Sequence, residues 1–367
     1  MDFTPYLNDL EARISPDVEE KLARDWENFV NGYCTDEVFR PSREPNPPRI
    51  KWQPVCVNDA FRDPELMIYS QLKSVSDTLA SGSGLLLSVR ANYGTGIIPS
   101  MFGAEILSLP DSANMLPGAM PLPDDRHLID RLIETDIDFS AGLITKVFEF
   151  GERFRELIRP YSKLKRFVHI YNPDFQGPFP LVDMLLGSRI YTDMYDDPDG
   201  INVLLARMTS LYLELTKKWQ KLCPPYSSDM SVEWGLLHRG LTMLRNDAVM
   251  NISPDMYREF VEKYDSSIFF YLGGGMHFCG RGDHYIDIAA GIKNLSCINM
   301  SQPHLNDMEK IYKHTVDRGI LIAGMPRAEV DRALAAGRPP RGRGDPRPRR
   351  PAQPPVGFYG GGGETVG

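Results

Sequence analysis

The sequence predicts an α/β fold with parallel strands, and an eight-stranded (β/α)8 barrel of the TIM type fits it best. Strand-like apolar runs alternate with helical segments, a pattern typical of parallel strands joined by right-handed crossovers. Seven such runs occur, and polar side chains follow several of them, as at the active-site end of a barrel. The chain has 367 residues, enough for one large α/β domain or two smaller ones. An open, doubly wound sheet is the alternative.

Helices are predicted where apolar residues recur at helical spacing, as Val18, Leu22 and Trp26 do. Ser253 and Pro254 mark a helix start, as N-cap and first helical residue. The predicted helices span residues 16–33, 66–79, 124–133, 141–158, 179–187, 197–222, 255–271, 283–290 and 305–316. Short apolar runs bounded by glycine or turn residues predict the strands. The predicted strands span residues 52–57, 84–91, 167–171, 241–246, 275–279, 295–300 and 319–323.

Two proline-rich segments interrupt this order. Residues 41–48 form a linker, and residues 103–123 are irregular enough to be an inserted hairpin or a lid. The chain therefore divides into an N-terminal helix and linker (1–50), a barrel (51–336) and a tail rich in Gly, Pro and Arg (337–367).

The composition is that of a soluble globular protein, with 42% hydrophobic and 25% charged residues. The net charge is -8, so the chain as a whole lacks the positive charge typical of nucleic-acid-binding proteins. Five scattered cysteines do not suggest a disulfide framework, so we expect a reducing cytoplasm. Neither a signal peptide nor an apolar run long enough to cross a membrane is visible.

The most informative segment is residues 273–284, in which His277-Phe-Cys279 follows three glycines. Residues two apart on a strand point to the same side, so His277 and Cys279 are placed to bind one ion. Cysteine and histidine are the preferred ligands of zinc. A buried cysteine and a hydrogen-bonded histidine at a strand end are the simpler alternative.

Other polar residues recur where predicted strands end. Carboxyl ends of parallel strands meet at one edge of the fold, so we expect these side chains to line one site. They are Asn58, Arg90, Asn92, Asn172, Asp174, Asp247, His277, Cys279, Asn299 and Gln302.

Four segments together resemble the uroporphyrinogen decarboxylase superfamily, which also contains zinc-dependent corrinoid methyltransferases. They are residues 172–179 (Asn-Pro-Asp-Phe-Gln-Gly-Pro-Phe), 251–260, 274–284 and 298–303 (Ile-Asn-Met-Ser-Gln-Pro). The resemblance covers about residues 50–325 and implies the (β/α)8 barrel.

The methyltransferase branch implies a zinc ion bound by His277, Cys279 and a distant cysteine near the last strand. The zinc activates a substrate thiol, which exchanges a methyl group with a corrinoid, so a small thiol and a corrinoid protein are the implied partners. No cysteine follows Cys297 in the sequence, so the third ligand is missing. Asp247, His284 or His304 could complete the site, and spacing leaves that choice open.

The resemblance leaves two further functions open. The decarboxylase branch grips substrate carboxylates with an N-terminal arginine-rich signature, which Arg62 alone does not reproduce. In a decarboxylase, Asp247 or Asp59 would stabilise a protonated pyrrole. The third possibility is a non-catalytic barrel that binds a corrinoid or a partner protein.

For the methyltransferase we assign roles as follows. Asp247 orients the metal or substrate, and Arg281 offers positive charge to an anionic group, or else forms a salt bridge that holds its loop. The substrate-binding candidates are Arg90, Asn92, Asn172, Asp174 and Gln302.

The tail, residues 337–367, breaks the pattern, because 22 of its 31 residues are Gly, Pro or Arg. Such a segment buries little apolar surface, so we expect disorder. Only residues 356–359 could supply the eighth strand. The tail is either aberrant, through a reading-frame change or truncation that would also explain the missing cysteine, or a functional basic tail that binds an anionic partner.

Overall fold

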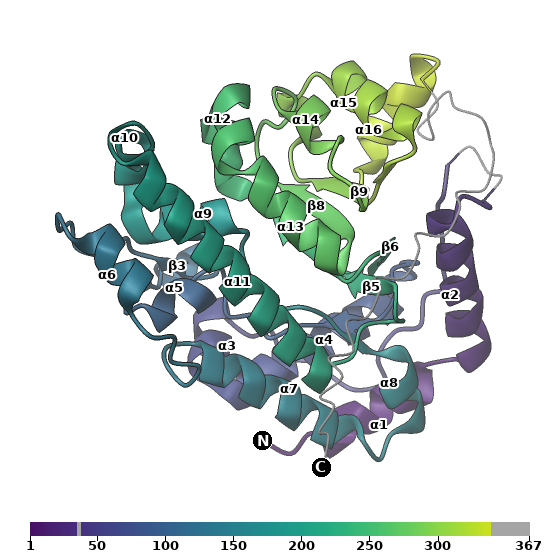
Figure 1. Cartoon of the computed structure of the whole chain (residues 1–367). Helices are drawn as coiled ribbons and strands as arrows, with labels where there is room; N and C mark the ends of the chain where they lie inside the picture. The colour runs from purple at the N-terminus through teal and green to yellow at the C-terminus, as the bar shows by residue number, and fades with distance from the viewer. Residues whose placement is uncertain (35–37, 339–367) are drawn as a thin grey trace, which may run out of the picture.

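The computed structural model describes residues 1–34 and 38–338 and has a mixed α/β fold with parallel strands (Figure 1). Four strands form a parallel sheet in the order β10-β9-β8-β7, and β1 pairs in parallel with β4. A single parallel bridge between Gln176 and Arg245 joins the chain after β4 to β7. The six strands are therefore neighbours in chain order. They are β1 (Ser88–Val89), β4 (His169–Ile170), β7 (Thr242–Arg245), β8 (Gly274–Phe278), β9 (Leu295–Met300) and β10 (Leu321–Ile322).

Six of the seven predicted strands are thereby confirmed, and the strand predicted at residues 52–57 is wrong. That segment has no regular structure and leads into helix α3 (Val57–Arg62). Pro54 lacks an N–H for a strand ladder, and the N–H of Gln53 donates to the hydroxyl of Tyr69 instead, at 2.7 Å. Trp52 packs against the rings of Tyr6 and Tyr69, and the segment joins no sheet.

The four-stranded sheet has two distinct faces. Its register pairs Met243 with Gly275, Gly275 with Cys297, Arg245 with His277, and His277 with Asn299. Because side chains alternate along a strand, these residues share one face, which we call the inner face. The opposite face, with residues such as Met276 and Ile298, belongs to the main hydrophobic core, with the helices.

An antiparallel hairpin that the sequence reading did not anticipate covers the inner face. It consists of β5 (Met230–Glu233) and β6 (Leu236–Arg239), and β6 contacts β8 and β9 (Figure 1). Its apolar side chains, including Leu236, form a cluster with Met243 and Cys297 of the sheet. A two-residue Trp-Gly turn between short apolar runs was the signal that could have revealed it.

The glycines before His277 allow β8 to pack closely against β7. A Cβ atom at Gly274 would lie 1.9 Å from the carbonyl oxygen of Thr242, and one at Gly275 would lie 2.6 Å from Cε of Met243. Gly274 also has a φ of 143°, which other residues rarely adopt. The glycines therefore allow β8 to approach β7 and so fix the position of His277.

The predicted helices are present with shifted ends, except that the helix predicted at 255–271 divides at Val261. Ser253 caps the first part as predicted, accepting the N–H of Met256. The helices flanking the strands are α1 (Thr4–Arg13), α2 (Pro16–Val30), α4 (Pro64–Ser81), α5 (Ile97–Met101), α6 (Leu128–Glu134), α7 (Ile144–Ile158), α8 (Ser162–Phe167), α9 (Pro178–Leu186), α10 (Ile190–Asp196), α11 (Pro198–Leu222), α12 (Pro254–Phe260), α13 (Glu262–Leu272), α14 (Ile286–Ala289), α15 (Met308–His314) and α16 (Arg327–Ala335). Within residues 103–123, β2 (Ile106–Leu107) and β3 (Gly118–Ala119) form the predicted hairpin.

A closed eight-stranded barrel is not formed by the described residues, since β10 pairs only with β9, and β1 only with β4. The tail residues 339–367, including the predicted strand 356–359, lie outside the described ranges. Among the described helices, none has the length and apolar character needed to span a membrane.

Asp265 of α13 is a buried carboxylic acid that makes stability depend on pH. Its Oδ2 accepts hydrogen bonds from Asn246 (2.6 Å) and Tyr257 (3.2 Å), while Oδ1 has no partner among the described residues. Burial raises the pKa of Asp265 to about 7, although both hydrogen bonds favour the carboxylate. The folded chain therefore retains a proton that the unfolded chain loses near pH 4. Its stabilising contribution is complete below about pH 4 and is lost as the pH rises through about 7.

We expect Asp265→Asn to remove this dependence. The stability of the variant relative to the wild type, measured as the difference in the free energy of unfolding, should be on the order of 2 kcal/mol greater at pH 8 than at pH 5. Urea denaturation at both pH values measures it, with the exposed Asp77→Asn as control. An equal effect of Asp265→Asn at both pH values would contradict the assignment of a protonated Asp265.

Candidate metal centre

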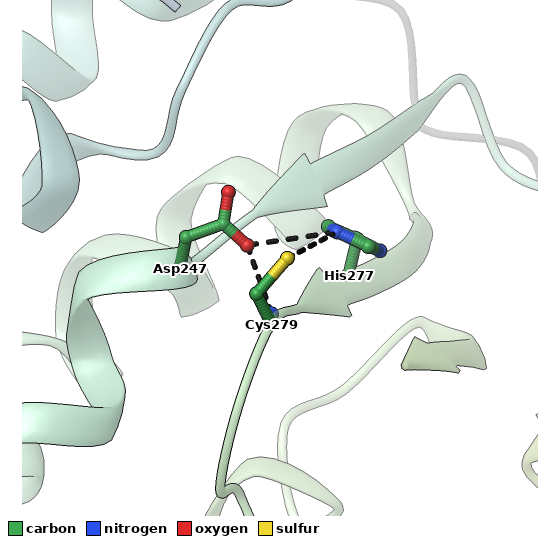
Figure 2. A group of neighbouring side chains, drawn as sticks. All are labelled: Asp247, His277 and Cys279. Carbon is green, nitrogen blue, oxygen red and sulfur yellow. Dashed lines mark hydrogen bonds and ion pairs between the residues drawn. The ribbon is translucent and has the colours of Figure 1, made fainter. Parts of the chain in front are cut away.

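Three side chains meet where β7 and β8 end, and we call them the metal triad (Figure 2). Asp247 lies two residues after the end of β7, His277 lies in β8, and Cys279 directly follows β8. Nε2 of His277 lies 3.5 Å from Oδ1 of Asp247 and 3.5 Å from Sγ of Cys279. All three ligand atoms lie within 4.8 Å of one another. Ligands about 2.0–2.3 Å from a shared tetrahedral ion lie about 3.3–3.6 Å apart, so the triad can bind one metal ion with little movement.

The hydrogen bonds of His277 leave Nε2 available as a ligand. Nδ2 of Asn299 donates to the carbonyl of Ala323 at 2.8 Å, so Oδ1 of Asn299 must face His277. This oxygen lies 2.6 Å from Nδ1 of His277 and can only accept, so Nδ1 carries the proton. The lone pair of Nε2 then points toward Asp247 and Cys279. Burial lowers the pKa of His277, which favours the neutral imidazole that a metal requires.

Cys279 is positioned by its backbone. Its N–H donates to Oδ1 of Asp247 at 2.9 Å, and its Sγ lies 3.4 Å from Oγ of Ser301. Burial, reinforced by the charge of Asp247, raises the pKa of Cys279 to about 11. The thiol is therefore neutral near pH 7, and a bound cation would convert it to the thiolate.

A buried ionic network adjoins the triad on the inner face. Arg245 is 2% exposed and Glu233 fully buried, and Nη2 of Arg245 lies 3.0 Å from Oε2 of Glu233. Asp174 lies 3.3 Å from Arg245 and 3.2 Å from Arg90, so two cations meet two anions. Asn172 donates to Glu233 at 3.0 Å. We call Arg90, Asp174, Glu233 and Arg245 the ionic network.

The two acids of the ionic network have pKa values shifted in opposite directions. Burial raises the pKa of Glu233 to about 7, although Arg245 and Asn172 favour the carboxylate. Burial also opposes ionisation of Asp174, but there Arg245 and Arg90 outweigh it and lower the pKa.

The structure thus brings Asp247, His277 and Cys279 together, and places the predicted substrate-binding residues Arg90, Asn172 and Asp174 in and around the ionic network. Of the three candidates for the missing ligand, Asp247 lies in the triad. Nε2 of His284 contacts the carbonyl oxygen of Ile252 at 3.0 Å, outside the triad.

Three other candidates lie apart from the metal triad. Arg281 has a side chain that is 62% exposed, and its Nε donates to Asp283 at 2.7 Å, which matches the alternative of a loop-holding salt bridge. Gln302 accepts the N–H of Gly280 at 2.5 Å and so fixes the loop after Cys279. Asn92 is half-buried after β1, and its Oδ1 has no partner among the described side chains and backbone.

Trp234 is a site residue that sequence reasoning missed. It lies in the turn of the β5–β6 hairpin, with its ring centroid 5.1 Å from that of His277. The guanidinium carbon of Arg245 lies 4.9 Å from the same indole ring. Arg245 was missed as well, because an arginine inside a strand usually indicates a solvated face.

No protein-family model matches the chain, and no curated protein matches it significantly in sequence.

Asn299 provides a direct test of the His277 tautomer. We expect Asn299→Leu to raise the dissociation constant for zinc by about 10–100-fold, because Nδ1–H of His277 loses its acceptor. Asn299→Asp keeps an acceptor and should retain affinity within about tenfold. Competition with a chromophoric chelator measures both. Equal affinity of Asn299→Leu and the wild type would show that Asn299 does not orient the imidazole.

Proposed function

We propose that the protein is a zinc-dependent methyltransferase of the uroporphyrinogen decarboxylase superfamily that transfers a methyl group between a corrinoid and a small thiol. The observation that carries the proposal is the convergence of Asp247, His277 and Cys279 at the carboxyl ends of adjacent parallel strands. We expect it to act in the cytoplasm, as the scattered cysteines predict.

The donor set fits zinc. Imidazole nitrogen, thiolate sulfur and carboxylate oxygen are all zinc ligands, and catalytic zinc sites combine three protein ligands with one open position. When bound there, zinc would lower the pKa of a substrate thiol and so supply a thiolate at neutral pH. His277, Cys279 and Asp247 would hold the ion, and Asn299 would orient His277.

The surrounding fold supports the superfamily assignment. The six parallel strands are neighbours in chain order, as in a (β/α)8 barrel. Three of the resembling segments, residues 172–179, 274–284 and 298–303, begin in or directly after β4, β8 and β9. They therefore lie toward the carboxyl ends of these strands, where (β/α)8 barrels have their active sites.

The charges around the triad favour methyl transfer over decarboxylation of a tetrapyrrole. A substrate with many carboxylates needs open guanidinium groups. Here Arg90 and Arg245 are paired with Asp174 and Glu233. Asp59, proposed to stabilise a pyrrole, pairs at 3.7 Å with Arg62 on the surface of α3.

Two measurements test the proposal. Cobalt-substituted protein should already show a sulfur-to-cobalt charge-transfer band from Cys279. Adding a millimolar thiol should intensify and shift this band, because the fourth ligand position is open. In zinc-loaded protein, the thiolate should take the methyl group of a methylcobalt(III) corrinoid, leaving the bonding electron pair on cobalt as a cobalt(I) corrinoid and forming a methyl thioether.

Cys279→Ala should lose both signals. If the cobalt spectrum of the metal-loaded wild type does not change when a thiol is added, the metal has no open ligand position and the site is structural. Methyl transfer would then be excluded. A thiol-responsive site without turnover in the presence of a corrinoid would instead favour the non-catalytic binder.

A further inference from the structure

The turn of the β5–β6 hairpin has a conformation that tryptophan rarely adopts. Trp234 has a φ of 51° and Gly235 a φ of 77°, both in the left-handed region. A two-residue turn with two positive φ values favours Asn-Gly, because a bulky side chain at the first position is strained. Strain of this kind persists where the surrounding structure enforces it, and is concentrated at functional sites.

The hairpin itself does not require tryptophan at this position. The carbonyl of Gly235 accepts the N–H of Leu86 at 2.9 Å, and β5 pairs with β6 through four residue pairs. A Cβ atom at Gly235 would lie 2.8 Å from the carbonyl oxygen of Leu86, so glycine is needed there. These contacts fix the turn whatever side chain residue 234 carries.

The indole ring of Trp234 packs against two neighbouring side chains of the inner face. His277 and Arg245 are partners in the register of β8 and β7. The ring planes of Trp234 and His277 are inclined at 53°, and the Arg245 guanidinium lies over the indole. Glu233, the residue before Trp234, holds the same guanidinium at 3.0 Å. Two adjacent residues of the hairpin, Glu233 and Trp234, thus hold Arg245, and Trp234 also contacts His277.

We propose that Trp234 is a positioning residue for the metal site: its indole ring holds the imidazole of His277 with Nε2 directed at Asp247 and Cys279. The hydrogen bond to Asn299 anchors only one atom of the imidazole, and the packed indole restricts the remaining tilt of the ring. In this proposal the strained turn is retained because it places the indole ring against His277. The inference rests on the metal site of the proposed function.

The test compares zinc affinity and cobalt spectra of Trp234 variants. Trp234→Asn suits the turn but removes the ring. We expect it to remain folded, to bind zinc about 10–100-fold more weakly, and to shift the visible absorption bands of bound cobalt. Trp234→Phe keeps a flat ring and should stay within about threefold of the wild type. Trp52→Phe removes an indole outside the site and should change neither quantity.

The outcomes separate this proposal from the function on which it rests. If the folded wild type binds no zinc, both are overturned. If the wild type binds zinc and Trp234→Asn binds it equally well with the same cobalt spectrum, only the role of Trp234 is overturned. Trp234→Leu, which keeps apolar bulk without a flat ring, gives the same test if Trp234→Asn does not fold.

Discussion

Replacing Asp247 with alanine is expected to weaken zinc binding by roughly a hundredfold or more, because one of three protein ligands is lost and each contributes about 3 kcal/mol. In the proposed zinc site, Asp247 supplies an anionic oxygen in place of the third cysteine that the resemblance implies. Oδ1 of Asp247 lies 3.5 Å from Nε2 of His277 and accepts the N–H of Cys279, so its removal also loosens the loop after β8. Chelator competition with folded protein measures the loss.

Two variants sharpen this prediction. Asp247→Asn keeps a neutral oxygen ligand and should bind zinc with intermediate affinity, since amide oxygen is a poorer ligand than carboxylate. Asp255→Ala removes an exposed carboxylate of α12 and should leave affinity unchanged. If Asp247→Ala binds zinc as tightly as the wild type, Asp247 is not a ligand and another residue must complete the site.

Replacing Arg245 with methionine is expected to destabilise the chain by about 3–5 kcal/mol at pH 8, because a buried cation is removed from its anionic partners. Glu233 is fully buried, and Asp174 is 9% exposed, so neither carboxylate can be rehydrated without opening the structure. Chemical denaturation monitored by circular dichroism gives the difference in the free energy of unfolding.

The pH dependence of this loss identifies its electrostatic origin. The pKa of Glu233 is already raised to about 7 by burial, and removing Arg245 raises it further. At pH 5.5 Glu233 is therefore protonated in both folded proteins, no buried Glu233 carboxylate loses its cation, and the destabilisation should shrink. Arg258→Met breaks a surface pair with Asp255 and should cost less than about 1 kcal/mol. A loss for Arg245→Met that is the same at both pH values would point to packing in place of charge.

The sequence was sufficient for those features that follow from local periodicity. The strand at residues 295–300 was predicted with the ends it has in the structure, because a compact apolar run is bounded by turn residues. The pairing of His277 with Cys279 followed from the two-residue repeat of a strand. The place of Asp247 followed from the rule that carboxyl ends of parallel strands meet.

Features set by contacts between distant segments could not be read in this way. The ligand atom of Asp247 reaches His277 only because β7 and β8 are in register, which spacing along the chain does not reveal. Trp234 belongs to a hairpin that is adjacent in sequence to neither Asn299 nor His277. Arg281 follows Cys279 closely, yet its side chain turns outward to Asp283, since Gly280 has a φ of 69° and redirects the loop.

The most direct test of the metal centre is the metal content of the purified chain without added zinc, measured beside a His277→Ala/Cys279→Ala variant. We expect about one zinc per wild-type chain and none in the variant, with both proteins folded. A folded wild-type protein that contains no zinc and does not bind added zinc would contradict the metal centre and, with it, thiol activation at this site.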